Sequence, residues 1–207
     1  MRRTPLPPIF LKVWASSHGQ PWHGLPNALR KTLENENRFL TPEFNAVSGQ
    51  RINEDVVAVI KNDMDSRSVR QIHIIIMGGN NIRSRGHATE VIPFFRSIIE
   101  YATNISGCFV VIVGLLPSPK TDIDSKKRFE NASSLLKQLT FRYSQKSSFL
   151  NAAKFFLKEL SEENSNVRGK VNETFFKDGI HLNNDGSEKL AKELRKHLVS
   201  LPNRKLR

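Results

Sequence analysis

Short apolar runs alternate along the chain with longer stretches in which apolar residues recur every three or four positions. The short runs are typical of buried β-strands, and the longer stretches are typical of amphipathic helices. Five strands are predicted, at residues 9–14, 44–47, 71–77, 108–116 and 148–150. The run 108–116 is apolar throughout, which favours a central strand that is covered on both faces.

Four helices are predicted, at residues 53–62, 88–103, 125–143 and 185–201. The clearest is 88–103, where Val91, Phe95, Ile98 and Ala102 fall on one helical face. Asp185 is a suitable N-cap for the last helix. Because strands alternate with helices, the predicted class is α/β, a three-layer α/β/α sandwich around a parallel five-stranded sheet. Chemistry in such sheets belongs at the carboxyl ends of the strands.

The length suits a single domain over residues 1–207, with flexible tails expected at 1–8 and 202–207. No run reaches the roughly 20 apolar residues of a membrane-spanning helix, and no signal peptide is recognised, so a cytoplasmic or nuclear location is expected. The one cysteine, Cys108, is expected to be a buried thiol. His73, inside a predicted strand, is interpreted as a core residue.

The formal net charge is +12, which is compatible with a polyanionic partner such as nucleic acid. The basic residues are scattered, however, with short clusters at 126–128, 189–196 and 204–205. No basic stripe is interleaved with aromatic residues. We therefore interpret the charge as a basic surface and keep nucleic-acid contact as the alternative.

Loops that carry polar residues or glycine follow the first three predicted strands. Ser17 follows the first strand, Gly49 the second and Asn80 the third. A serine in such a place can act as a nucleophile beside backbone N–H donors, and an asparagine amide can donate to an oxyanion. Each residue also has a simpler interpretation, as a helix cap, a tight turn or a plain loop.

Asp178 and His181 lie three residues apart in a loop that leads into the last predicted helix. This spacing lets the carboxylate accept a hydrogen bond from the imidazole, which fixes the tautomer of a histidine that takes a serine proton. A surface loop with two polar residues is the alternative. No histidine shows metal-ligand spacing, so no metal is expected. His18 and His23 flank Ser17 and are candidates for lining its pocket.

These segments, in this order, resemble the sequence blocks of the SGNH, or GDSL-like, hydrolase superfamily of the esterase and acetylhydrolase type. The most specific is 178–183, Asp-Gly-Ile-His-Leu-Asn, which is similar to the family's Asp-x-x-His motif. Residues 78–81, Gly-Gly-Asn-Asn, are similar to its Gly-x-Asn-Asp block. The resemblance covers nearly the whole chain and implies the flavodoxin-like SGNH hydrolase fold.

The resemblance implies roles for five residues. Ser17 would be the nucleophile, His181 the general base and then the acid, and Asp178 the carboxylate that orients it. The oxyanion hole would consist of the Ser17 and Gly49 backbone N–H groups and the Asn80 side chain. The implied reaction is hydrolysis of an acetyl or short acyl ester of a small or acylated molecule through an acyl-enzyme, without metal or organic cofactor.

The chain also departs from the family pattern. Ala15-Ser16-Ser17 stands where the family usually has Gly-Asp-Ser, so Ser16 is a rival nucleophile. Asn81 stands where aspartate is usual, and it keeps an acceptor oxygen, so the loop geometry is expected to survive. The alternative function is a catalytically weakened binding module with the same fold, associated with nucleic acid like the esterase modules of some retrotransposon proteins.

Overall fold

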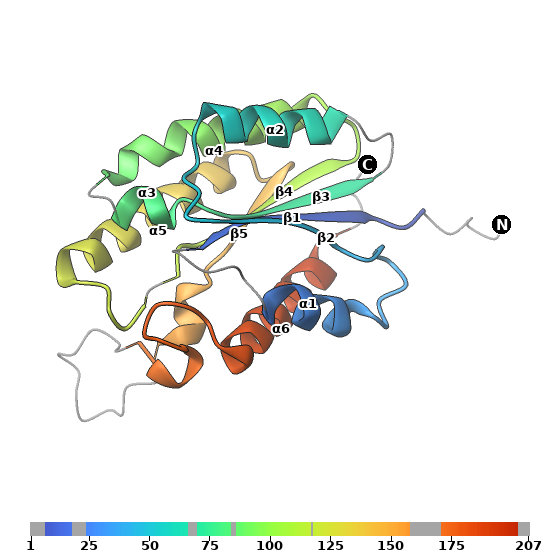
Figure 1. The fold of residues 1–207 in the computed structure, drawn as a ribbon. Coiled ribbons are helices and arrows are strands. Elements are labelled where there is room, and N and C mark those ends of the chain that lie inside the picture. The colour runs from blue at the N-terminus through green and yellow to red at the C-terminus, as the bar shows by residue number, and fades with distance from the viewer. Residues whose placement is uncertain are drawn as a thin grey trace.

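The computed structural model describes residues 7–17, 24–65, 70–83, 86–116, 118–157 and 171–202. Its centre is one parallel sheet with the strand order β2-β1-β3-β4-β5 (Figure 1). The strands are β1 (Phe10–Ser17), β2 (Glu43–Ser48), β3 (Gln71–Ile76), β4 (Cys108–Val113) and β5 (Ser147–Leu150). The predicted five-stranded parallel sheet is therefore confirmed.

Helices cover both faces of this sheet, which confirms the three-layer α/β/α sandwich. The α-helices are α1 (Gly24–Leu33), α2 (Glu54–Asp65), α3 (Gly79–Arg83), α4 (Ala88–Thr103), α5 (Ile123–Arg142) and α6 (Asn184–Ser200). Two short 3-10 helices, η1 (Ala153–Phe156) and η2 (Glu173–Phe175), precede α6. Helices α1 and α6 lie on one face, and α2 and α4 lie on the other (Figure 1).

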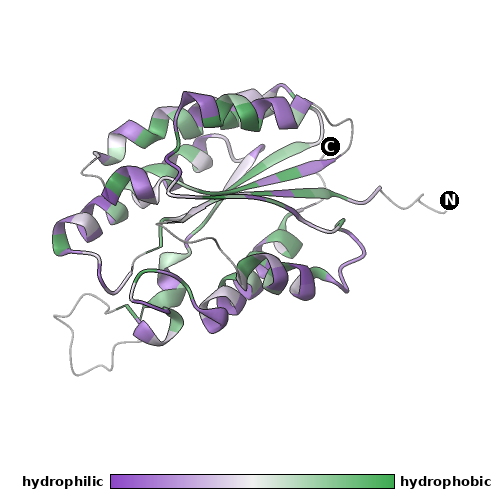
Figure 2. Ribbon diagram, viewed as in Figure 1, coloured by the Kyte–Doolittle hydropathy of each residue, from purple (hydrophilic) through white to green (hydrophobic). Residues whose placement is uncertain are grey.

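The two cores form because successive strand residues point to opposite faces of the sheet. In β4, Phe109, Val111 and Val113 pack with α1 and α6, whereas Cys108, Val110 and Ile112 pack with α2, α4 and α5. All six side chains are buried, and burial of each large one contributes about 1.5–3 kcal/mol. Figure 2 shows the same division, with hydrophobic strands between helices whose outer faces are hydrophilic.

A polar network crosses the core between β1, β3 and α2. Trp14 Nε1 donates to His73 Nδ1 at 3.2 Å, and His73 Nε2 lies 2.8 Å from Gln71 Oε1. Gln71 in turn donates to the Met64 carbonyl at 2.9 Å. Since Nδ1 accepts from the indole, the proton of the imidazole sits on Nε2 and is directed at Gln71. This confirms His73 as a core residue whose polar atoms are paired.

Several predicted boundaries differ from the observed ones. Strand β1 continues to Ser17, three residues beyond the predicted end, because it pairs with β2 up to Ser17 and Ser48. Asn183, not Asp185, caps α6, since its side chain accepts from the Gly186 N–H at 2.9 Å. Helices α1 and α3 were not predicted.

Some predictions fall outside the described residues: the tail segments 1–6 and 203–207, and the two histidines His18 and His23. Among the described helices, none has the length and apolar character that crossing a membrane requires.

The strand order defines where a ligand should bind. From β1 the chain moves outward to β2 and then returns to place β3 on the other side of β1. The crossovers on the two sides of β1 therefore diverge, which opens a crevice beyond the carboxyl ends of β1 and β3.

Candidate active site

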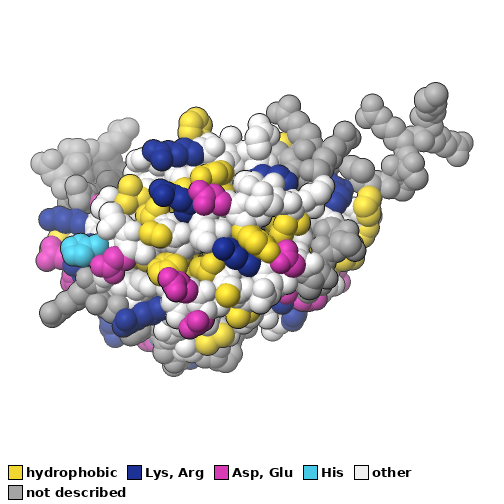
Figure 3. All heavy atoms as spheres, turned by 90° about the horizontal axis from the view of Figure 1, so that it is seen from above, with side chains coloured by type: hydrophobic (Ala, Val, Ile, Leu, Met, Phe, Trp, Pro, Cys, Tyr) yellow, Lys and Arg dark blue, Asp and Glu magenta, His cyan; other side chains and the backbone are white. Residues whose placement is uncertain are grey.

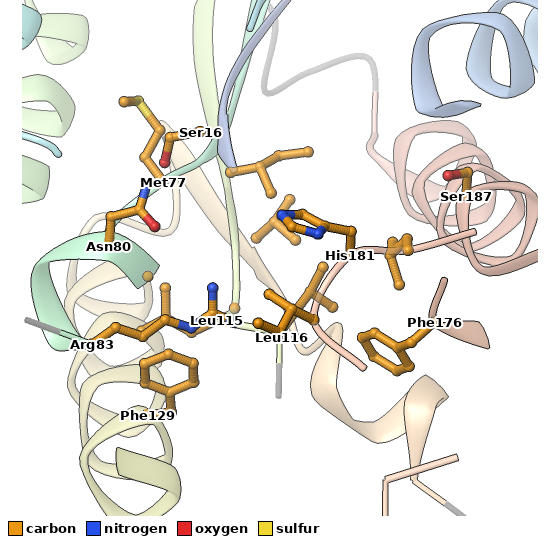
Figure 4. A pocket seen from close by; sticks show the side chains of 16 residues that line it. Ser16, Met77, Asn80, Arg83, Leu115, Leu116, Phe129, Phe176, His181 and Ser187 are labelled. Carbon is orange, nitrogen blue, oxygen red and sulfur yellow. The ribbon is translucent and has the colours of Figure 1, made fainter. Parts of the chain in front are cut away.

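A cavity lies at this crevice, beyond the carboxyl ends of β1, β3 and β4 (Figure 4). Ser16, Met77 and Gly114 line it from these strand ends, and His181 lines it from the loop before α6. The cavity volume is about 80 Å³, which is room for several water-sized groups. The site is therefore assembled from both ends of the chain.

The loop before α6 holds Asp178 against His181. The imidazole Nδ1 lies 2.7 Å from Asp178 Oδ2, while Asp178 Oδ1 accepts from the backbone N–H groups of Ile180 at 3.0 Å and of His181 at 2.9 Å. Gly179 adopts a φ of +80°, a conformation that side chains disfavour, and this lets the loop turn back so tightly. The predicted pairing of Asp178 with His181 is confirmed.

These contacts also set the electrostatics of the pair. The backbone N–H of His181, and then its imidazole, hold the pKa of Asp178 well below its usual range. The carboxylate therefore stays ionised and keeps Nδ1 of His181 as its hydrogen-bond donor. As a result, Nε2 is the ring nitrogen with a lone pair that can accept a proton.

The loops after β2 and β3 are joined by two asparagines. Asn81 Oδ1 accepts from the Ile52 N–H at 3.0 Å, and Asn81 Nδ2 donates to the Ile52 carbonyl at 2.9 Å. Asn80 Nδ2 donates to the Gln50 carbonyl at 3.0 Å, next to Gly49, whose φ is +71°. An aspartate at position 81 would accept the first bond but has no hydrogen to donate for the second. Asn81 thus joins the two loops by a pair of bonds that an aspartate could not make in full.

The predicted site residues differ in how they relate to the cavity. Asn80 and His181 line it, and Asp178 contacts His181. The Ser17 backbone ends β1, in register with Ser48 and so beside Gly49, but the Ser17 side chain lies outside the described residues. Gly49 itself is not among the described residues that line this cavity.

Two lining residues stand apart from the predicted set. Ser16, the rival nucleophile, is buried, and its Oγ accepts or donates no hydrogen bond among the described residues. Sequence reasoning missed Arg83, which lines the same cavity from the end of α3. In the sequence, the one indication of a role for Arg83 is its position three residues after Asn80. In the described ranges, no group of three or more metal-ligating side chains comes together.

Comparison with known proteins finds similarity in structure alone. No protein-family model matches the sequence, and no curated protein matches it either. Among solved structures, TesA shares 17% identity at a TM-score of 0.67, over 91% of this chain and 97% of its own. A member of the lipolytic protein G-D-S-L family from Veillonella parvula shares 14% identity at a TM-score of 0.68, over 93% of this chain and 100% of its own. A catalytic mutant of Axe2, an acetylxylan esterase from Geobacillus stearothermophilus, shares 11% identity at a TM-score of 0.67, over 95% of this chain and 96% of its own.

These similarities extend over nearly the full length of both chains in each comparison. The protein therefore has the α/β fold of the SGNH, or GDSL-like, hydrolases. At such low sequence identity the similarity concerns the fold, and the chemistry has to be argued from the site.

Proposed function

We propose that this protein is a serine ester hydrolase that cleaves an acetyl or short acyl ester through an acyl-enzyme. The observation that carries the proposal is the Asp178–His181 pair, whose imidazole lines a small cavity at the crevice of the sheet. A short acyl group is compatible with this cavity, whose volume is about 80 Å³. Esterases among the structural neighbours support the same reaction class.

In the proposed reaction, Ser17 is the nucleophile. Its Oγ forms a bond to the ester carbonyl carbon while His181 Nε2 takes the hydroxyl proton. The tetrahedral intermediate then expels the alcohol, which receives that proton from His181. Water attacks the resulting acyl-enzyme in the same manner, with His181 again as base, and releases the carboxylic acid and Ser17. Asp178 keeps Nδ1 protonated and stabilises the imidazolium in both halves.

The negative charge on the carbonyl oxygen needs donors at the same edge of the sheet. We assign this role to the backbone N–H groups of Ser17 and Gly49 and to the side chain of Asn80. Asn80 lines the cavity, and its bond to the Gln50 carbonyl fixes the orientation of its amide. Such an oriented donor commonly contributes about 2.7–4 kcal/mol to transition-state stabilisation.

Turnover of 4-nitrophenyl acetate by purified variants tests the proposal. Ser17→Ala and His181→Ala should each abolish turnover and leave the thermal unfolding transition intact. Ser16→Ala distinguishes the rival nucleophile, and Ser106→Ala, in the exposed turn before β4, is the matched control. Wild-type turnover in His181→Ala would refute the mechanism, and turnover that survives in Ser17→Ala but is lost in Ser16→Ala would move the nucleophile by one residue.

Binding of nucleic acid remains the alternative, motivated by the net charge of +12. Figure 3 shows lysines and arginines interspersed with acidic side chains on the face seen from above, without one continuous basic area among the coloured atoms. Binding of single-stranded RNA measured at two salt concentrations tests this alternative, since phosphate contacts would make the affinity fall steeply with salt. No binding at low salt would eliminate it.

A further inference from the structure

Arg83 places a cationic group inside the candidate active-site cavity. It ends α3, and in Figure 4 its side chain extends into the cavity from the wall opposite His181, above Phe129. Its guanidinium carbon lies 5.6 Å from the centre of the Phe129 ring, a cation–π contact. Its one described hydrogen bond, to Ser118 Oγ, is long at 3.5 Å. The guanidinium therefore lies against an aromatic ring, and the described residues use its N–H donors poorly.

No described side chain neutralises Arg83. In the described part of the chain the guanidinium makes no ion pair, and burial lowers its pKa. Apolar side chains, Leu115, Leu116 and Phe129, lie next to it in the cavity wall. A charge in such a place is costly unless an anion pairs with it. The one described carboxylate in the loop before α6, that of Asp178, is already hydrogen-bonded to His181.

We propose that Arg83 is a specificity-determining residue that selects esters carrying an anionic group, a carboxylate or a phosphate-like group, a few bonds from the scissile carbonyl. The proposal rests on the proposed hydrolase function and names its substrate class. A guanidinium presents paired N–H donors that match two oxygens of such a group, and that of Arg83 lies against the ring of Phe129. Because Arg83 and His181 line the same cavity, the anionic group and the scissile carbonyl have to lie close together in the substrate.

Paired substrates test the proposal and locate the anion. In one pair, the 4-nitrophenyl monoester of glutaric acid is compared with 4-nitrophenyl valerate, so that only the acyl group differs in charge. In the other, a sulfonated naphthyl acetate is compared with naphthyl acetate, so that only the leaving group differs. The wild-type enzyme should prefer the anionic member of one pair by about tenfold or more in kcat/KM, as expected for a charge-assisted hydrogen bond.

Variants assign this preference to the guanidinium. Arg83→Met should reduce the ratio of anionic to neutral kcat/KM to near one, and Arg83→Lys should retain part of it, because lysine keeps the charge but loses the fork. Arg96→Met, which removes an exposed arginine on α4, is the control and should keep the ratio. No preference in the wild type, or an unchanged ratio in Arg83→Met, would overturn the proposal.

A binding measurement separates this proposal from the hydrolase mechanism. Free glutarate or inorganic phosphate should raise the unfolding temperature of the wild type but not that of Arg83→Met, whether or not any ester is turned over. If neutral esters are hydrolysed without any anion preference, only the role of Arg83 fails. If no ester is hydrolysed but the anion stabilises the wild type through Arg83, only the proposed reaction fails. If neither anion stabilises the wild type and no preference exists, the anion site is refuted.

Discussion

Replacing Asp178 by asparagine should impair catalysis severely while leaving the fold nearly unchanged. The amide oxygen of the new side chain would still accept the backbone N–H groups of Ile180 and His181, which the carboxylate accepts at 3.0 and 2.9 Å. The amide nitrogen would then face Nδ1 of His181 and require it to act as an acceptor. The imidazole proton would move to Nε2, and that nitrogen would lose its function as a base.

The size of this effect follows from the position of Asp178. A buried aspartate in such a triad contributes about 10⁴ to kcat, or about 5.5 kcal/mol. The Asp178 side chain is 38% exposed, so water weakens its coupling to the imidazole. We therefore expect Asp178→Asn to lower kcat/KM by about 10²–10³-fold. Asp178→Ala, which also removes the acceptor of both backbone N–H groups, should cost about 1 kcal/mol of stability in addition.

The assay is hydrolysis of 4-nitrophenyl acetate across a pH series, combined with urea unfolding of each variant. The expected result is a large loss of kcat/KM in Asp178→Asn with an unfolding midpoint close to that of the wild type. Activity within about threefold of the wild type in Asp178→Asn would refute the assigned role, because a change of tautomer cannot be so mild. A loss of activity that only tracks a loss of folded protein would refute it as well.

Three further predictions concern the loop contacts of Asn81, the buried bond of Trp14 and the ionisation of Asp178. Asn81→Asp should cost about 1–2 kcal/mol in urea unfolding, because the bond to the Ile52 carbonyl is lost and a charge approaches that oxygen. Trp14→Phe should cost about 1–3 kcal/mol in the same measurement, because it removes the indole donor to buried His73. The lowered pKa of Asp178 means that its carbon NMR signal should still report the ionised form at about pH 4, where an ordinary aspartate is half protonated. The ionised Asp178 therefore stabilises the folded protein above the pKa that Asp178 has in the unfolded chain. This stabilisation is lost as the pH falls through its lower pKa in the folded protein.

The loop before α6 and the sheet could be predicted from the sequence because their signals are local. Asp178 and His181 lie within one short turn, so their spacing alone brings carboxylate and imidazole together. Strand β4 is a continuous apolar run and β3 is rich in isoleucine, and both are buried along their whole length, as a sheet covered on both faces requires. By contrast, the end of β1 at Ser17 depends on pairing with β2, and that register is not encoded in any local pattern.

Helix α1 was missed although Leu25, Leu29 and Leu33 recur every fourth residue and are buried. Its first turn contains Gly24 and Pro26, which resemble a loop, but a proline is tolerated there because the first N–H groups of a helix have no partner within it.

Arg83 could not be assigned from the sequence because its environment is formed by tertiary packing. The ring beneath it, Phe129, belongs to α5, and the imidazole across the cavity belongs to the loop before α6. Nothing near Arg83 in the chain indicates either neighbour. The cavity that leaves its charge without an ion-pair partner among the described residues forms only in the folded chain.

The central claim is that a serine at the end of β1 is activated by His181. Labelling of the wild-type protein with a fluorophosphonate probe, followed by peptide mapping, tests this claim most directly. The expected result is a single modified residue, Ser17, with labelling lost in His181→Ala; modification of Ser16 instead would keep the claim and correct the nucleophile. Absence of labelling in folded wild-type protein, or a modified serine remote from the end of β1, would contradict it.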